Sequence, residues 1–114
     1  MIARAVAAAC VATACSVLAQ QPAPSPAFAP ANLSPAGVRA MAANCAPCHG
    51  TEGRAAPGST VAGLAGRAPG EIVEAMTLFR EGKKPATVMH QIAKGFTEPE
   101  VAALDEYFSR QKVR

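Results

Sequence analysis

Residues 45–49 constrain this chain more than any other stretch. They read Cys45-Ala-Pro-Cys48-His49, two cysteines three positions apart followed at once by a histidine. This C-x-x-C-H pattern is typical of covalent attachment of a c-type haem, in which both thiols bond to one porphyrin and the adjacent imidazole reaches the iron. A chain with this motif has to fold around a large, flat, apolar group, so the motif limits the fold as well as the chemistry.

Other sites that use C-x-x-C fit the chain less well. A thioredoxin-like redox site lies in a βαβ pattern, and the sequence shows none. A zinc site needs about four ligands, and no second pair of Cys or His stands at a suitable spacing. A plain disulfide leaves His49 without a role. Because the motif occurs once, it predicts a single covalently bound haem c.

The N-terminus predicts an export signal followed by a spacer. Arg4 supplies a positive charge, and the apolar run 5–19 is too short to span a bilayer comfortably. Val17, Leu18 and Ala19 match a cleavage site, which makes 1–19 a signal peptide. Residues 20–32 are rich in Pro and Ala and predict an extended spacer. The folded, haem-binding domain is then 33–114, and we expect it in the periplasm.

Two further cysteines, Cys10 and Cys15, fall inside the predicted signal. The simplest interpretation is that both are small apolar residues lost on cleavage. The alternative is lipidation at Cys15, but Ala12 stands where such sites usually have Leu, and apolar residues continue beyond Cys15. Membrane tethering by this route is therefore the weaker prediction, and the mature chain keeps one useful cysteine pair in an oxidising compartment.

The rest of the chain predicts an all-α domain of three to five short helices around one haem. Ser34 is a good N-cap before Pro35, so a helix is expected over 35–44. An apolar stripe predicts a second helix over 69–81, and a third is expected over about 85–93. Thr97 and Glu100 form a capping box for a last helix that ends near 111. Residues 51–68, rich in glycine, predict a loop that wraps the cofactor.

Size and composition agree with a cofactor-dependent fold. The chain has 114 residues, no Trp and 4% aromatic residues, so its polypeptide core is small. Small domains of this kind need a staple, and a covalent porphyrin is one. The net charge of +3 and the absence of a basic run with interleaved aromatics exclude a nucleic-acid-binding module.

If His49 is one iron ligand, its other nitrogen should donate to a carbonyl group. The second ligand has to come from elsewhere, and the candidates are Met41, Met76, Met89 and His90. Met41 and Met76 fall on apolar helix faces and predict packing, whereas His90 is expected on the surface. Met89 follows a turn-rich stretch and is the preferred ligand. His/Met ligation raises the reduction potential relative to two nitrogen ligands.

From Ser34 to Gln111 the sequence resembles the class I c-type cytochromes, in particular short c553/c4-like domains such as the cytochrome subunit of flavocytochrome c sulfide dehydrogenase. The resemblance is carried by residues 45–53 (CAPCHGTEG), by 60–63 (TVAG), by 79–82 (FREG) and by 87–96 (TVMHQIAKGF). Gly37, Leu104 and Tyr107 match the crossing of the family's first and last helices. The resemblance implies the class I cytochrome c fold, haem c, and iron ligation by His49 and Met89.

The resemblance leaves the acceptor of the His49 proton open. The family commonly has a proline just before the position of Thr60, and its carbonyl accepts that proton. In this chain Ser59 stands there, with Pro57 two residues earlier. Arg54 and Arg67 are candidate partners of the haem propionates.

Three functions follow from these patterns. The preferred one is a periplasmic mono-haem cytochrome, not an enzyme, that carries single electrons between redox proteins. The alternative is the electron-accepting cytochrome subunit of a dehydrogenase, such as a sulfide-oxidising flavoprotein. A catalytic or sensing haem protein needs an open sixth coordination site. Lys83, Lys84 and Lys94 flank Met89 and form either a rim that steers acidic partners or an ordinary solvated face.

Overall fold

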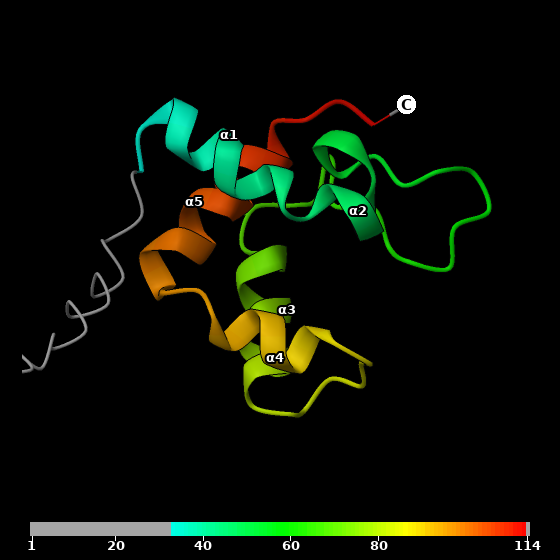
Figure 1. Ribbon diagram of the computed structural model, residues 1–114, viewed down its shortest axis with the longest axis vertical. Helices are drawn as coiled ribbons and strands as arrows, with labels where there is room; N and C mark the ends of the chain where they lie inside the picture. The colour runs from blue at the N-terminus through cyan, green and yellow to red at the C-terminus, as the bar shows by residue number, and fades with distance from the viewer. Residues whose placement is uncertain (1–32, 114) are drawn as a thin grey trace, which may run out of the picture.

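The computed structural model describes residues 33–113, and within this range it is helical and contains no strand. The predicted signal peptide 1–19 and spacer 20–32 lie outside the described residues. None of the helices in 33–113 has the length and apolarity needed to cross a bilayer. The all-α prediction is confirmed (Figure 1). The elements in order are α1 (Pro35–Ala43), α2 (Ala46–His49), the 3-10 turn η1 (Thr51–Gly53), α3 (Glu71–Arg80), α4 (Met89–Lys94) and α5 (Glu98–Ser109).

The first and last helices pack together, as the resemblance implied. Both begin where the capping signals indicated. The hydroxyl of Ser34 accepts a hydrogen bond from the Gly37 N–H at 3.2 Å, which satisfies one of the free donors in the first turn of α1. At the start of α5, the Thr97 N–H donates to the Glu100 carboxylate at 2.6 Å. These local contacts fix where the two helices start.

A buried carboxylate joins α5 to the beginning of α3. Asp105 is 7% exposed, and it accepts hydrogen bonds from the Gly70 N–H at 2.8 Å and the Ile72 N–H at 3.0 Å. The first N–H groups of a helix have no partner inside that helix, so a carboxylate placed there satisfies them and favours the positive end of the helix dipole. Asp105 therefore caps α3 from another helix.

The apolar core of the described residues is small. Only Phe108 among the large side chains is almost completely buried, at 1% exposure. A ring of partly buried apolar side chains borders the core, including Leu64, Phe79 and Phe96. The buried apolar residues are Val38, Ala42, Ile72, Met76, Ala93, Val101, Leu104 and Phe108.

The third helix starts four residues later than expected. It was predicted over 85–93, but α4 runs from Met89 to Lys94. Val88 is its N-cap, with a φ of −125° that is not helical. The β-branched residues Thr87 and Val88 disfavour helical backbone, which explains the late start better than Pro85 alone. The second and last helices are each a residue or two shorter at their ends than predicted.

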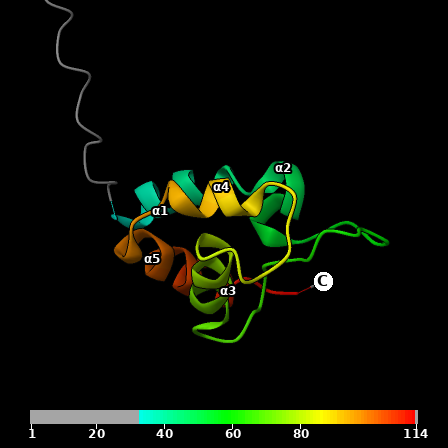
Figure 2. The same cartoon turned by 90° about the horizontal axis from the view of Figure 1, so that it is seen from below.

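The predicted loop over 51–68 is irregular after η1 and projects from the body of the molecule in both ribbon views (Figures 1 and 2). Its far end returns to the core at three backbone contacts. The N–H groups of Leu64 and Ala65 donate to the Gly53 carbonyl, and the Gly66 N–H donates to the Phe108 carbonyl at 2.9 Å. The loop is therefore anchored at its base, while residues 56–62 are exposed.

Candidate functional site

Helix α2 carries the C-x-x-C-H motif on a single turn. Cys45 is its N-cap, and the His49 N–H donates to the Cys45 carbonyl at 2.9 Å. Both thiols are free within the described residues. Cys48 is exposed, whereas Cys45 packs partly against the core, and this burial raises the pKa of its thiol. One helical turn thus presents two unpaired sulfurs and an imidazole together.

Gly50 ends α2 and turns the chain sharply away from it. Its φ is +82°, a conformation that other residues rarely adopt. A Cβ at this position would lie 1.9 Å from the Arg54 carbonyl oxygen, so there is no room for a side chain. The residue after the histidine therefore has to be glycine for this backbone path.

The imidazole of His49 is oriented by a backbone carbonyl. Its Nδ1 donates to the Ala62 oxygen at 2.7 Å. Because a carbonyl oxygen only accepts, Nδ1 carries the proton, which leaves the lone pair of Nε2 free. The acceptor is Ala62, three residues beyond the family's proline position at Ser59. The Ser59 hydroxyl is instead engaged with the N–H and carbonyl of Val61, both at 3.1 Å.

The four candidates for a second ligand occupy different environments. Met76 is buried in the core and Met41 packs against it, as predicted. The ring of His90 meets the edge of Phe79, with the ring centroids 6.4 Å apart. Met89 is the first residue of α4, partly buried against the core. It lies at the start of the helix that was expected over about 85–93.

We call residues 45–62 the attachment segment and residues 83–96 the methionine segment. In Figure 1, α2 lies in the upper part of the molecule and α4 in the lower part. In the view from below, both lie in one layer, with α3 and α5 in the other (Figure 2). Helices α2 and α4 are thus on the same side of the α3–α5 layer.

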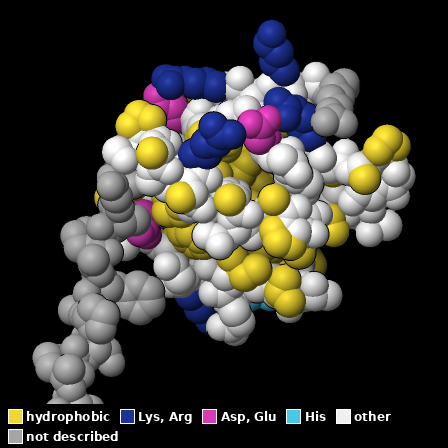
Figure 3. All heavy atoms as spheres, turned by 45° about the horizontal axis from the view of Figure 1, so that its top comes forward, with side chains coloured by type: hydrophobic (Ala, Val, Ile, Leu, Met, Phe, Trp, Pro, Cys, Tyr) yellow, Lys and Arg dark blue, Asp and Glu magenta, His cyan; other side chains and the backbone are white. Residues whose placement is uncertain are grey.

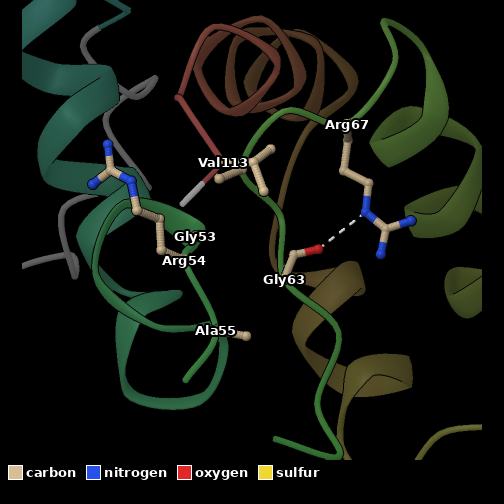
Figure 4. A pocket seen from close by; sticks show the side chains of 7 residues that line it. Gly53, Arg54, Ala55, Gly63, Arg67 and Val113 are labelled. Atoms are coloured by element: carbon tan, nitrogen blue, oxygen red, sulfur yellow. Dashed lines mark hydrogen bonds between the residues drawn. The ribbon is translucent and has the colours of Figure 1, made fainter. Parts of the chain in front are cut away.

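Arg54 and Arg67 line an open pocket of about 330 Å³ at the base of the loop (Figure 4). Both guanidinium groups are already engaged by protein atoms. Arg54 pairs with Glu52 and donates through Nε to the Lys112 carbonyl at 2.8 Å. Each guanidinium already has a carboxylate partner in the protein. The pairing of these arginines with haem propionates stays a prediction.

Arg67 is held in a similar way. It pairs with Glu71 and donates through Nε to the Gly63 carbonyl at 3.0 Å.

The competing uses of C-x-x-C require settings that can be looked for in the described residues. Across residues 33–113, no three or more His, Cys, Asp or Glu side chains are grouped to hold a metal ion. The same range has no strand, and so lacks the βαβ setting of a thioredoxin-like site.

Comparisons with known proteins identify the family. No protein-family model matches the chain. The chain is 36% identical over 87 residues to the cytochrome subunit of sulfide dehydrogenase from Chlorobaculum tepidum, an alignment that covers 76% of each protein. It is also 35% identical over 65 residues to cytochrome c-552 from Acidithiobacillus ferridurans, which covers 57% of this chain and 27% of that protein.

Both relatives are cytochromes, which are electron-transfer proteins and not themselves catalytic enzymes. The extent of the first alignment, together with the all-α fold and the paired cysteines on α2, shows the family. The chain belongs to the c-type cytochromes, electron carriers with covalently bound haem c.

Proposed function

We propose that Cys45 and Cys48 attach one haem c and that His49 and Met89 are the axial ligands of its iron. The hydrogen bond from His49 Nδ1 to the Ala62 carbonyl carries this proposal. It fixes the tautomer that an iron ligand requires, with Nε2 free, and it does so beside two unpaired thiols.

The packing of the described residues fits a large apolar group. Apolar side chains reach the surface over a wide area on the face shown in Figure 3. Both segments contain exposed apolar residues. Val61 in the attachment segment is 39% exposed, and Val88 and Ile92 in the methionine segment are 53% and 43% exposed. Exposed apolar surface of this extent in a small domain is typical of a binding site.

When bound, haem c supplies one-electron redox chemistry, and the protein sets its ligands and surroundings. His49 is held in one orientation by Ala62, and Met89 is presented by α4. With His49 and Met89 both bound to the iron, no coordination position would be open to O₂, which would favour electron transfer. A thioether ligand also raises the reduction potential relative to a second imidazole.

We further propose export to the periplasm with cleavage after Ala19. The apolar run and the small residues at 17–19 support this. Mass spectrometry of the mature protein should give a chain that begins at Gln20 and carries one haem. A mature chain that begins at Cys15 would support lipidation instead.

The partner is a redox protein, and a flavoprotein is a specific second possibility. It is favoured by the relative from Chlorobaculum tepidum, whose name describes a subunit of sulfide dehydrogenase. Co-purification of the chain with a flavoprotein from its own organism would favour the fixed-subunit role. A chain purified alone that exchanges electrons with several carriers would favour the shuttle role.

The lysines near Met89 would attract an acidic partner only weakly. Lys83 pairs with Glu81 at 2.8 Å, and the Lys84 ammonium lies over the Phe79 ring, 5.3 Å from its centroid. Glu81 therefore offsets one of the three positive charges, whereas Lys84 keeps its charge over the Phe79 ring.

The assignment of Met89 is tested by replacing methionines one at a time with leucine, which conserves volume. Oxidised Met89→Leu should lose the methionine-sulfur-to-iron charge-transfer band, and its reduced form should bind CO rapidly. Met41→Leu is the matched control, because Met41 is also partly buried, and it should keep the band. A band that persists in Met89→Leu would show that the ligand is another residue. Rapid CO binding by the wild type would favour the sensing or catalytic alternative.

A further inference from the structure

Arg80 is the last residue of α3, and its side chain reaches the far end of α4. It is partly buried. Its Nε donates to the Ala93 carbonyl at 3.3 Å and its Nη2 to the Phe96 carbonyl at 2.9 Å. Among the ion pairs of residues 33–113, Arg54, Arg67 and Arg110 each have a carboxylate partner and Arg80 has none. Its donors are directed at backbone carbonyls of the methionine segment.

The Ala93 carbonyl lies in the last turn of α4, and the Phe96 carbonyl lies just beyond the helix. The last carbonyls of a helix lack partners within the helix, and a cation there also interacts favourably with the helix dipole. A planar guanidinium can reach two such acceptors at once, which an ammonium group cannot do with the same geometry. Arg80 therefore links the C-terminal end of α4 to the C-terminal end of α3 by hydrogen bonds.

Helix α4 packs against α3, but it buries little of its own surface. It has six residues, too few to be stable as an isolated helix, and Ala93 is its one buried residue, at 0% exposure. Met89 lies four residues before Ala93, so the two share a face of the helix. Any movement of the Ala93 end of α4 is therefore transmitted to Met89 within one turn.

We propose that Arg80 is the positioning residue for Met89, and that its two hydrogen bonds keep the thioether directed at the iron. This inference rests on the proposed ligation by Met89. When Arg80 is removed, α4 should spend more time displaced, and the sixth coordination position should open to an added ligand. An added ligand measures this population directly, because its apparent affinity scales with the fraction of molecules in the open state.

The test is a titration of the oxidised holoprotein with imidazole, followed by loss of the methionine-sulfur-to-iron band. Loss of a single hydrogen bond from a charged donor corresponds to about a tenfold change in an equilibrium constant. We therefore expect Arg80→Met to bind imidazole at least about tenfold more tightly than the wild type. Methionine keeps much of the aliphatic stem and removes both hydrogen bonds.

Arg110→Met is the matched control. It removes the same charge from α5's C-terminal end, where Arg110 makes an exposed pair with Glu106. Its imidazole affinity should stay within about twofold of the wild type, because exposed pairs contribute little. Arg80→Lys keeps the positive charge but not the planar group with several donors. Its imidazole affinity should lie between those of the wild type and Arg80→Met. Arg80→Lys also serves as the test variant if Arg80→Met does not accumulate as holoprotein.

The outcomes separate this inference from the ligand assignment. Unchanged imidazole affinity in the Arg80 variants, with a lower urea midpoint measured by far-ultraviolet circular dichroism, would assign Arg80 a purely structural role and overturn the inference. If Met89→Leu loses the methionine-to-iron band and the Arg80 variants keep it as firmly as the wild type, the proposed function stands and the inference about Arg80 does not. Absence of the band from the wild type would remove both proposals together.

Discussion

The attachment segment and the methionine segment are held in different ways. In the attachment segment, the contacts that set His49 lie within the segment itself: the turn of α2, Gly50 and the Ala62 carbonyl. In the methionine segment, α4 depends on groups from outside it, namely Arg80 and the face of α3. One iron ligand is thus set by local sequence and the other by tertiary packing.

This difference predicts an order of unfolding. Bonds from Cys45 and Cys48 would hold the attachment segment on the haem covalently, whereas the methionine segment is held by non-covalent contacts alone, which can open locally. We therefore expect the methionine segment to detach first while His49 and the covalent attachment persist. Disturbing the two segments should consequently have different effects. Three substitutions test the comparison in order of decreasing effect, one in the attachment segment and two at groups that hold the start of α3.

Gly50→Ala should have the largest effect, because it breaks the attachment segment itself. The added Cβ clashes with the Arg54 carbonyl, and the φ of +82° is strained for alanine. We expect a loss of about 4 kcal/mol in the free energy of unfolding, with a low yield of holoprotein. The measurement is the amount of covalently haem-loaded protein per cell, followed by urea unfolding of what is recovered.

Gly58→Ala is the control for that experiment. Gly58 also has a positive φ, +78°, but nothing lies within 4 Å of a Cβ built there. Only the conformational strain remains, so the cost should be about 1 kcal/mol. Equal losses of stability in Gly50→Ala and Gly58→Ala would mean that the clash between a Cβ at position 50 and the Arg54 carbonyl contributes nothing.

Asp105→Ala should have the next largest effect, and it should act on the methionine side. The substitution leaves the N–H groups of Gly70 and Ile72 without their acceptor at the start of α3, which supports α4. We expect a loss of about 2–3 kcal/mol, with the methionine-to-iron band lost at lower urea than in the wild type.

The neighbouring Glu106→Ala is the control for Asp105→Ala. Glu106 is exposed and pairs with Arg110, so its removal should change stability by less than about 1 kcal/mol. If Asp105→Ala lowered stability no more than Glu106→Ala, the capping role of Asp105 would be wrong.

Glu71→Gln should have the smallest effect, and the effect should depend on pH. The hydrogen bond from Arg67 is the main cause that lowers the pKa of Glu71, with a further contribution from the Ala68 N–H. A lowered pKa in the folded state means that Glu71 stabilises the fold above its ordinary pKa, and that this contribution is lost as the pH falls through the lowered value.

The difference in urea midpoint between the wild type and Glu71→Gln should therefore be present at pH 7 and should shrink below about pH 4. Glu74→Gln, which removes an exposed charge from the same helix, controls for the change in net charge. A difference that grows as the pH falls would contradict the assigned direction.

The features that were predictable from sequence are those coded by neighbouring residues. Ser34 with Pro35 gave the start of α1, and Thr97 with Glu100 gave the start of α5, because a cap acts within one turn. The C-x-x-C-H motif is likewise local. The expected loop was confirmed, since glycine-rich sequence without periodicity has no alternative element to form.

The features that were missed depend on residues far apart in the chain. Asp105 lies 33 positions after Ile72, and its role required knowing that α5 crosses the start of α3. One signal was available: Asp105 falls four residues after Val101, on the buried side of α5, where a carboxylate needs a partner. No such signal marks Ala62, because every residue has a carbonyl. The late start of α4 is a small local effect, since Thr87 and Val88 disfavour helix only weakly in a stretch that otherwise fits one.

The contacts proposed to set both ligands end on main-chain carbonyls, those of Ala62, Ala93 and Phe96. A point substitution replaces a side chain but cannot delete a carbonyl, so these positions should tolerate many residues. An insertion or deletion between Gly50 and Ala62 would instead move the acceptor away from His49. The acceptor positions should therefore be robust to substitution, whereas the loop before Ala62 should be sensitive to changes in length, which is a useful rule for engineering it.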